Sequence, residues 1–225
     1  MNPIASYIDH TLLKPTALIS DIQQLCEEAI TYEFTAVCVP PVFLTTARES
    51  IAGETVKLAT VIGFPFGYSA PKAKLAEVQQ AIRDGAEELD IVINIAALKN
   101  KAWNYLNAEI RPLVDYIHEQ DAIVKVIIES GILTRDEILR CCEIYTPFEV
   151  DFLKTSTGYA EKGASVEAVE LMRANLPFNI RIKASGGIKT YKFAQELIEA
   201  GADRLGCSAS IAIVQGREQN NLAGY

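Results

Sequence analysis

Short apolar runs alternate with amphipathic segments along the whole chain. The runs are rich in valine and isoleucine, as expected of parallel strands that are covered on both faces. The segments between them carry apolar residues at helical spacing. Eight strands are therefore predicted, at residues 9–13, 36–39, 58–62, 88–94, 123–129, at the run that carries Lys154, at the run that carries Lys183, and at 204–207.

Several helix ends are marked by capping residues. Ser69 is predicted to cap the helix that starts at Pro71, because a serine hydroxyl can accept from a free amide and proline fits the first helical turn. Gly85 is predicted to end that helix in a left-handed conformation. Thr134, followed three residues later by Glu137, has the pattern of a capping box.

The regular alternation of eight strands with helices predicts a parallel (β/α)₈ barrel of the TIM-barrel type. We expect residues 1–225 to form a single domain, with a short extra helix over residues 3–8 before the first strand. Residues 82–89 and 198–205 repeat one pattern of helix end, glycine and strand start, half a barrel apart. No linker or low-complexity segment interrupts the alternation.

The composition narrows the choice of partners and compartment. Apolar residues make up 49% of the chain, which provides a sizeable core, and the net charge is −8. An acidic chain is unsuited to nucleic acid or an anionic membrane as its main partner, although a local basic pocket is still allowed. The five cysteines are an odd number without a C-x-x-C pair, and no signal peptide or membrane-length apolar run is seen. We therefore predict a cytoplasmic protein with reduced thiols and no zinc site.

Two neighbouring strands each end with a lysine followed by small hydroxyl residues and glycine. Lys154 lies in Asp151–Gly158, and Lys183 lies in Arg181–Gly187. Burying a lysine is costly unless the group is paired or takes part in chemistry. Each lysine alone could extend to solvent or pair with a carboxylate. The repeated pattern instead favours a functional site.

Alternation along the strands indicates which side chains share the barrel interior. The active site of such a barrel lies at the carboxyl ends of the strands. If Lys154 and Lys183 point inward, Lys125 and Asp90 on neighbouring strands can join them. The same alternation predicts inward side chains at Cys38, Thr60, Val92, Asn94, Ile127, Glu129, Phe152, Ser156 and Ser185.

This set of side chains suits amine catalysis. A lysine attacks a carbonyl only when neutral, and its ordinary pKa of about 10.4 leaves it protonated at neutral pH. Burial and a neighbouring cation both lower that pKa. Lys183 would supply the cation beside Lys154, and Asp90 would balance the charge or relay protons. Asp90 could equally be an ordinary ion-pair partner, and the two roles are compatible.

Glycine-rich turns after the last two strands suit a phosphate group. Gly186 and Gly187 follow the seventh strand, and Gly206 and Ser208 lie at the end of the eighth. Barrels often bind phosphate at this place through backbone amides and a short helix N-terminus.

Five motifs together resemble the 2-deoxyribose-5-phosphate aldolase family, and they span nearly the whole chain: 9–11, 88–94, 124–129, 152–158 and 182–187. The resemblance implies reversible cleavage of 2-deoxy-D-ribose 5-phosphate to D-glyceraldehyde 3-phosphate and acetaldehyde, with no metal and no cofactor. It implies that Lys154 forms a Schiff base with the substrate. Lys183 and Asp90 would then donate or accept protons.

The resemblance also assigns binding residues. Phosphate would lie against Gly158, Gly186, Gly187 and Ser208. Asp9 and Thr11 would face the sugar, and Lys125 is placed in the same substrate site. Tyr225, at the C-terminus, would fold over the mouth and relay a proton at the acetaldehyde methyl carbon.

Two positions depart from the family pattern. Some relatives carry a lysine directly after Ser-Thr-Gly, where this chain has Tyr159, and some pair two serines where this chain has Ser208–Ala209.

Two rival functions stay open: a lysine aldolase of the same fold that acts on another phosphorylated sugar, and a sugar-phosphate binding protein without catalysis. The chain also leaves room for a homodimer.

Overall fold

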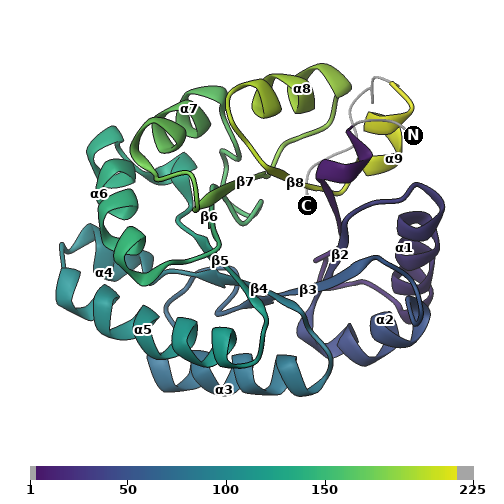
Figure 1. Ribbon diagram of the computed structural model, residues 1–225, viewed down its shortest axis with the longest axis horizontal. Coiled ribbons are helices and arrows are strands. Elements are labelled where there is room, and N and C mark those ends of the chain that lie inside the picture. Colours follow the sequence, from purple (N-terminus) through teal and green to yellow (C-terminus); the bar gives the residue numbers. More distant parts are fainter. Residues whose placement is uncertain (1–3, 217–225) are drawn as a thin grey trace.

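Eight parallel strands pair in chain order, and the first strand closes the ring against the last (Figure 1). This closed ring of strands confirms the predicted barrel. The computed structural model describes residues 4–216. The strands are β1 (Ile8–Thr11), β2 (Ala36–Val39), β3 (Lys57–Ile62), β4 (Glu88–Val92), β5 (Ile123–Ile127), β6 (Phe152–Lys154), β7 (Arg181–Ser185) and β8 (Arg204–Cys207).

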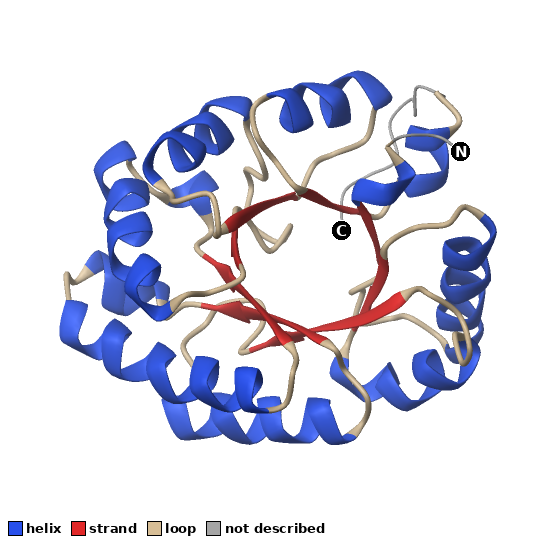
Figure 2. Ribbon diagram, viewed as in Figure 1, coloured by secondary structure: helices blue, strands red, loops and turns tan. Residues whose placement is uncertain are grey.

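Helices surround the ring of strands on its outside (Figure 2). They shield the outer face of the sheet from water, so that both faces of every strand are covered. The helices are α1 (Ile19–Thr31), α2 (Leu44–Ser50), α3 (Pro71–Arg83), α4 (Ile95–Lys99), α5 (Trp103–Glu119), α6 (Arg135–Tyr145), α7 (Val166–Asn175), α8 (Tyr191–Glu199) and α9 (Ser210–Val214). Single 3₁₀ turns are η1 (Ala5–Tyr7), η2 (Pro41–Phe43), η3 (Ser130–Ile132) and η4 (Thr146–Phe148).

The predicted helix signals were right in most cases. Thr134 caps α6 and forms the expected reciprocal pair with Glu137. Gly85 follows α3 with φ +107°, a conformation that glycine adopts readily. The prediction for Ser69 was wrong, because Ala70 is the residue before the helix and no side chain caps it. Pro71 lacks an amide hydrogen, so the first turn has one less donor to satisfy.

Two predicted boundaries were wrong at the carboxyl ends of strands. The strand β4 ends at Val92, and Asn94 instead caps α4 by accepting from the amide of Ala97 at 2.9 Å. The strand β5 ends at Ile127, and Glu129 has a left-handed backbone with φ +58°. Both residues belong to the loops at the carboxyl end of the barrel.

The first strand also differs from the expectation. It begins at Ile8 and ends at Thr11, so residues 12 and 13 lie in the loop. The predicted extra helix is reduced to the single turn η1.

The side chain of Thr60 does not point into the barrel, contrary to the prediction. Cys38 pairs in register with Ala59, and these two pack with Val61 in a small interior cluster. Thr60 therefore faces the surrounding helices, where its hydroxyl donates to the carbonyl oxygen of Val39 at 2.8 Å. The strand is apolar on both faces, so the sequence offers no contrast that fixes which face is inside.

Candidate active site

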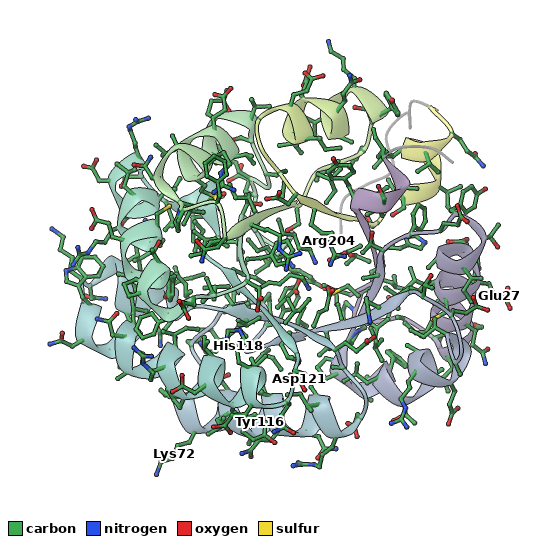
Figure 3. The ribbon with its side chains drawn as sticks, viewed as in Figure 1. Glu27, Lys72, Tyr116, His118, Asp121 and Arg204 are labelled. Atoms are coloured by element: carbon green, nitrogen blue, oxygen red, sulfur yellow. The ribbon has the colours of Figure 1, made fainter. Side chains whose placement is uncertain are left out.

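The barrel interior holds a continuous network of ion pairs contributed by six of the eight strands. Its members are buried, with the most accessible, Arg204, only 6% exposed. Figure 3 shows Arg204 within the ring of strands, whereas Glu27 and Lys72 lie on the outside. The members are Asp9, Glu88, Asp90, Lys125, Lys154, Lys183 and Arg204.

Asp90 lies at the centre of this network. Its Oδ2 accepts from Lys154 Nζ at 2.7 Å and from Lys183 Nζ at 2.8 Å, and its Oδ1 accepts from Lys125 Nζ at 2.9 Å. The strand register explains the arrangement, because Lys154 pairs with Lys183 across β6 and β7, and Asp90 pairs with Lys125 across β4 and β5. The structure thus brings together the four residues that strand alternation placed inside.

A second layer of charges supports the first. Asp9 Oδ2 lies 2.5 Å from Lys183 Nζ, and its Oδ1 accepts from Arg204 at 2.8 Å. The other terminal nitrogen of Arg204 donates to Glu88 Oε1 at 2.8 Å. Glu88 Oε2 lies 2.6 Å from Lys125 Nζ, an ion pair that lacks the alignment of a hydrogen bond. Each carboxylate is therefore shared between cations from different strands.

The two lysines at the carboxyl end have opposite electrostatic surroundings. Burial lowers the pKa of Lys154, the charge of Lys183 lowers it further, and Asp90 only partly offsets them. Burial also disfavours the charge of Lys183, but Asp9 and Asp90 together outweigh it and raise the pKa of that lysine. Although burial opposes it, the three lysines hold the pKa of Asp90 well below its usual range. Lys154 is thus the amine that loses its proton most easily.

Gly206 makes room for the side chain of Lys183. A Cβ at this position would lie 3.2 Å from Lys183 Cε and 2.8 Å from Ser185 Cβ. Any larger residue on β8 would push one of these side chains aside, so the glycine serves the interior as well as the loop that follows.

Hydroxyl groups fix the loop that follows Lys154. Ser185 Oγ donates to the carbonyl oxygen of Ser156 at 2.6 Å, and the Ser185 amide donates to Thr155 Oγ1 at 3.1 Å. The hydroxyl of Thr157 donates to the carboxylate of Glu129, whose pKa is raised by burial. The small hydroxyl residues of the repeated motif therefore tie the loops after β5, β6 and β7 together.

A cavity of about 770 Å³ opens at the carboxyl ends of β1, β6, β7 and β8. Thr11, Gly158, Gly186, Gly187 and Ser208 line it, which are five of the residues that the sequence assigned to substrate or phosphate. At Gly187 the backbone has φ +76°, and an added Cβ would meet nothing within 4 Å, so this face is open. The charged side chains of the lining are Lys14 and Lys189 together with Asp21, Glu28 and Glu161.

Five assigned residues do not line the cavity and are buried in the ion-pair network: Asp9, Asp90, Lys125, Lys154 and Lys183. Tyr225 lies outside the described residues. Tyr159, the departure from the family pattern, lines the cavity, and its phenol donates to the carbonyl oxygen of Leu13 at 2.8 Å.

Sequence reasoning missed several members of the site. Arg204 lies two residues before Gly206 on β8, and Glu88 lies two residues before Asp90 on β4. Because side chains two apart share a face of a strand, this spacing could have placed both charged residues in the interior. His10 is another missed residue: its Nδ1 lies 2.9 Å from Ser210 Oγ, and its Nε2 lies 2.8 Å from Glu28 Oε2. These two contacts join β1 to α9 and α1, and both His10 and Glu28 line the cavity.

The described residues contain neither a metal-binding cluster nor a membrane-spanning helix. No group of three or more His, Cys, Asp or Glu side chains within residues 4–216 could hold a metal ion. In the same part of the chain, no helix has both the length and the apolar character needed to cross a membrane.

A closed barrel whose centre pairs two lysines with one aspartate is the arrangement expected of an amine-catalysed aldolase. Comparison with known proteins agrees. A family model described as DeoC/LacD family aldolase matches residues 4–217, and the chain belongs to this family.

Individual relatives cover nearly the whole chain. It is 48% identical to a deoxyribose-phosphate aldolase of Thermococcus gammatolerans over 95% of this chain and 96% of that protein. It is 45% identical to the enzyme of the same name from a Geobacillus strain over 98% of each. The solved structure of a tetrameric deoxyribose phosphate aldolase from Aeropyrum pernix superposes with a TM-score of 0.88 at 31% identity, over 94% of this chain and 89% of that one.

Proposed function

We propose that the protein is a metal-independent Schiff-base aldolase that reversibly cleaves 2-deoxy-D-ribose 5-phosphate to D-glyceraldehyde 3-phosphate and acetaldehyde. The observation that supports this most directly is the buried amine of Lys154, which shares one oxygen of Asp90 with the cation of Lys183. The names of the relatives point to the same substrate.

The proposed reaction begins with attack of neutral Lys154 Nζ on the C1 aldehyde of the open-chain sugar. Loss of water gives an iminium ion, which accepts the electron pair of the C2–C3 bond when the C3 hydroxyl loses its proton. Glyceraldehyde 3-phosphate leaves, and an enamine remains on the lysine. A proton added at C2 and a water added at C1 then release acetaldehyde and restore the amine.

Lys183 and Asp90 are proposed as the groups that move these protons. The Lys183 ammonium is a donor held next to Lys154 by the shared carboxylate. Asp90 can pass a proton between the two nitrogens, because both contact the same oxygen. Tyr225 is proposed as a further proton relay.

The cavity suits the rest of the substrate. Backbone amides near Gly158, Gly186 and Gly187, with the positive charge of Lys14 and Lys189, are proposed to receive the phosphate. Thr11 and Asp9 are proposed to face the sugar hydroxyls. The role of Lys125 at the substrate stays a prediction.

The wider assignments are also proposals. We propose that the enzyme is cytoplasmic, since all five cysteines are free and buried. We also propose that residues 1–225 act as one domain. A homodimer is the proposed assembly, which light scattering can test. Neither nucleic acid nor a membrane is proposed as a partner, because the chain carries a net charge of −8.

Trapping the intermediate tests the function. The protein is incubated with acetaldehyde and sodium borohydride, and the modified residue is mapped by mass spectrometry. The expected label is on Lys154, and Lys154→Arg should give no label, because a guanidinium keeps the charge but does not form the imine. A label on Lys183 or Lys125 in the unaltered protein would exchange the proposed roles.

A second assay separates the rival functions. With glyceraldehyde 3-phosphate as acceptor, acetaldehyde should be preferred to other aldehydes and ketones as donor. Preference for another donor would indicate a different lysine aldolase. Binding of the phosphorylated sugar without turnover would indicate a binding protein.

A further inference from the structure

The ion-pair network contains more positive than negative groups. Four cationic side chains, Lys125, Lys154, Lys183 and Arg204, share three carboxylates. Ionised groups that are buried this deeply are stable only when their charges balance closely. Loss of one proton from this network removes the surplus, and Lys154 is the lysine that holds its proton least.

Two members of this network lie away from the chemistry. Among the described residues, Arg204 and Glu88 form no ion pair with Lys154 or Lys183, and their mutual contact of 2.8 Å joins β8 to β4. Arg204 also contacts Asp9, and through it Lys183. Glu88 contacts Lys125, and through it Asp90. Arg204 is therefore separated from Lys183 by Asp9 alone, and Glu88 is separated from Lys154 by Lys125 and Asp90.

We infer that Arg204 and Glu88 are positioning residues that set the protonation of Lys154 through the charge balance of the barrel interior. The inference rests on the proposed function of Lys154 as the imine-forming amine. It assigns to both residues a role that needs no contact with the substrate. Arg204 supplies the surplus positive charge, and Glu88 limits it.

Other ionisable groups face Lys154 and stay unchanged in the test. They are Cys38 on β2, Asp90 on β4, Glu129 after β5 and Lys183 on β7, with Asp9, Lys125 and Cys207 around Lys183. Burial raises the pKa of Cys38 to about 11, so its thiol stays neutral. Glu129 adds a carboxylate at the mouth, but its hydrogen bonds go to Thr157. Because these groups are common to every variant, the differences between variants report on positions 88 and 204.

The two residues are expected to act in opposite directions. Arg204→Met removes a positive charge, so Lys154 should keep its proton to higher pH and form the imine more slowly at neutral pH. Glu88→Gln removes a negative charge, so Lys154 should lose its proton at lower pH. At low pH the rate of imine formation rises with pH as Lys154 loses its proton; we call this part of the pH–rate profile the acid limb. One charge several ångströms away in a protein interior should move the acid limb by about one pH unit. At a fixed pH on that limb, the rate then changes roughly tenfold.

The double variant is the decisive measurement. Arg204→Met with Glu88→Gln removes one charge of each sign and restores the native balance, so its acid limb should return close to the native position. The readout is the rate of adduct formation at Lys154 with acetaldehyde and cyanoborohydride, measured against pH. Arg204→Lys keeps the charge and should leave the limb nearly in place.

A merely structural role gives a different result. In that case both single variants would lose rate at every pH without a shift of the limb, and the double variant would be worse than either, which would overturn the inference. If Arg204→Met does not fold, a limb that stays in place or rises in Glu88→Gln overturns it equally. If the unaltered protein forms no adduct at Lys154, the proposed function fails and the inference with it. If it forms the adduct but the limbs do not move, only the inference fails.

Discussion

Tyr159 donates a hydrogen bond from its phenol to the carbonyl oxygen of Leu13, at 2.8 Å. The two residues lie in the loops after β6 and β1, at the mouth of the barrel. The ring of Phe64, from the loop after β3, meets the tyrosine ring edge-on with centroids 5.3 Å apart. The loops after β1, β3 and β6 thus meet at one side chain, at the position where the sequence departs from the expected family pattern.

Replacing Tyr159 with Phe tests this contact. The ring packing is kept and the bond to Leu13 is lost, which typically costs about 1 kcal/mol. Because Lys14 lies in the same loop as Leu13 and lines the cavity, we expect KM for the phosphorylated sugar to rise about two- to tenfold with kcat little changed. Steady-state kinetics check this. A fall in kcat with an unchanged KM would show that the phenol takes part in the chemistry instead.

Lys183→Leu should slow imine formation at neutral pH. The variant removes the cation beside Lys154, so the pKa of Lys154 should rise from its lowered value. A rise of one unit reduces the neutral amine about tenfold. Raising the pH should recover adduct formation but not turnover, since Lys183 is also proposed to move protons. Unaltered adduct kinetics at all pH values would contradict the assignment.

Gly187→Val should weaken binding of the phosphate. Gly187 lines the cavity, and a side chain there would enter open space that the phosphate is proposed to occupy. We expect at least a tenfold loss in kcat/KM for 2-deoxyribose 5-phosphate and little loss for 2-deoxyribose. Gly53→Val is the matched control, because Gly53 has a similar left-handed backbone, φ +87°, with open space around it. Equal losses for both sugars would mean that the glycine shapes the loop only.

The interior carboxylates should make the protein sensitive to acid. The folded-state pKa of Asp90 is lowered, so its stabilisation is complete above the unfolded value of about 3.9 and is lost as pH falls below it. We expect the free energy of unfolding, measured with urea, to fall between pH 5 and pH 3 by less in Asp90→Asn than in the native protein. Asp115→Asn, at an exposed pair on α5, is the control and should leave the slope unchanged. The same slope in all three proteins would contradict the prediction.

Chelation should leave the activity intact. The sequence shows no cluster of His, Cys and carboxylate residues with the spacing of a metal site, and the proposed chemistry uses amines. Turnover after extended dialysis against EDTA should match that of the untreated enzyme. Loss of turnover that a divalent ion restores would contradict this prediction.

The sequence predicted the strands and the interior lysines well because both depend on local signals. Apolar runs mark the strands, and the repeated lysine motif marks two neighbouring strand ends. The sequence predicted the strand ends poorly at Asn94 and Glu129. Asn94 caps α4, and Glu129 lies before η3 and accepts a hydrogen bond from Thr157, so the conformation of each depends on residues outside the strand. Thr60 was placed on the wrong face because its strand is apolar on both sides.

The supporting charges could not be found in this way. The contact between Arg204 and Glu88 joins residues 116 positions apart. It exists only because the ring closes and brings β8 opposite β4 across the interior. Arg204 and Glu88 are the first residues of β8 and β4. Charged residues at strand starts are common at protein surfaces, so neither strand alone indicates that the two pair in the interior.

Closure of the ring by β1 and β8 also has a consequence for how the protein is made. Asp9 emerges early from the ribosome, and Lys183 and Arg204 emerge almost last. Until the final strand docks, the interior charges have no enclosed network, and Lys154 keeps the ordinary basicity of a solvated lysine, largely protonated at neutral pH. The surroundings that lower the pKa of Lys154 are complete only when the ring is closed. If Lys154 is the proposed nucleophile, an unfinished chain is expected to react with aldehydes more slowly than the folded protein.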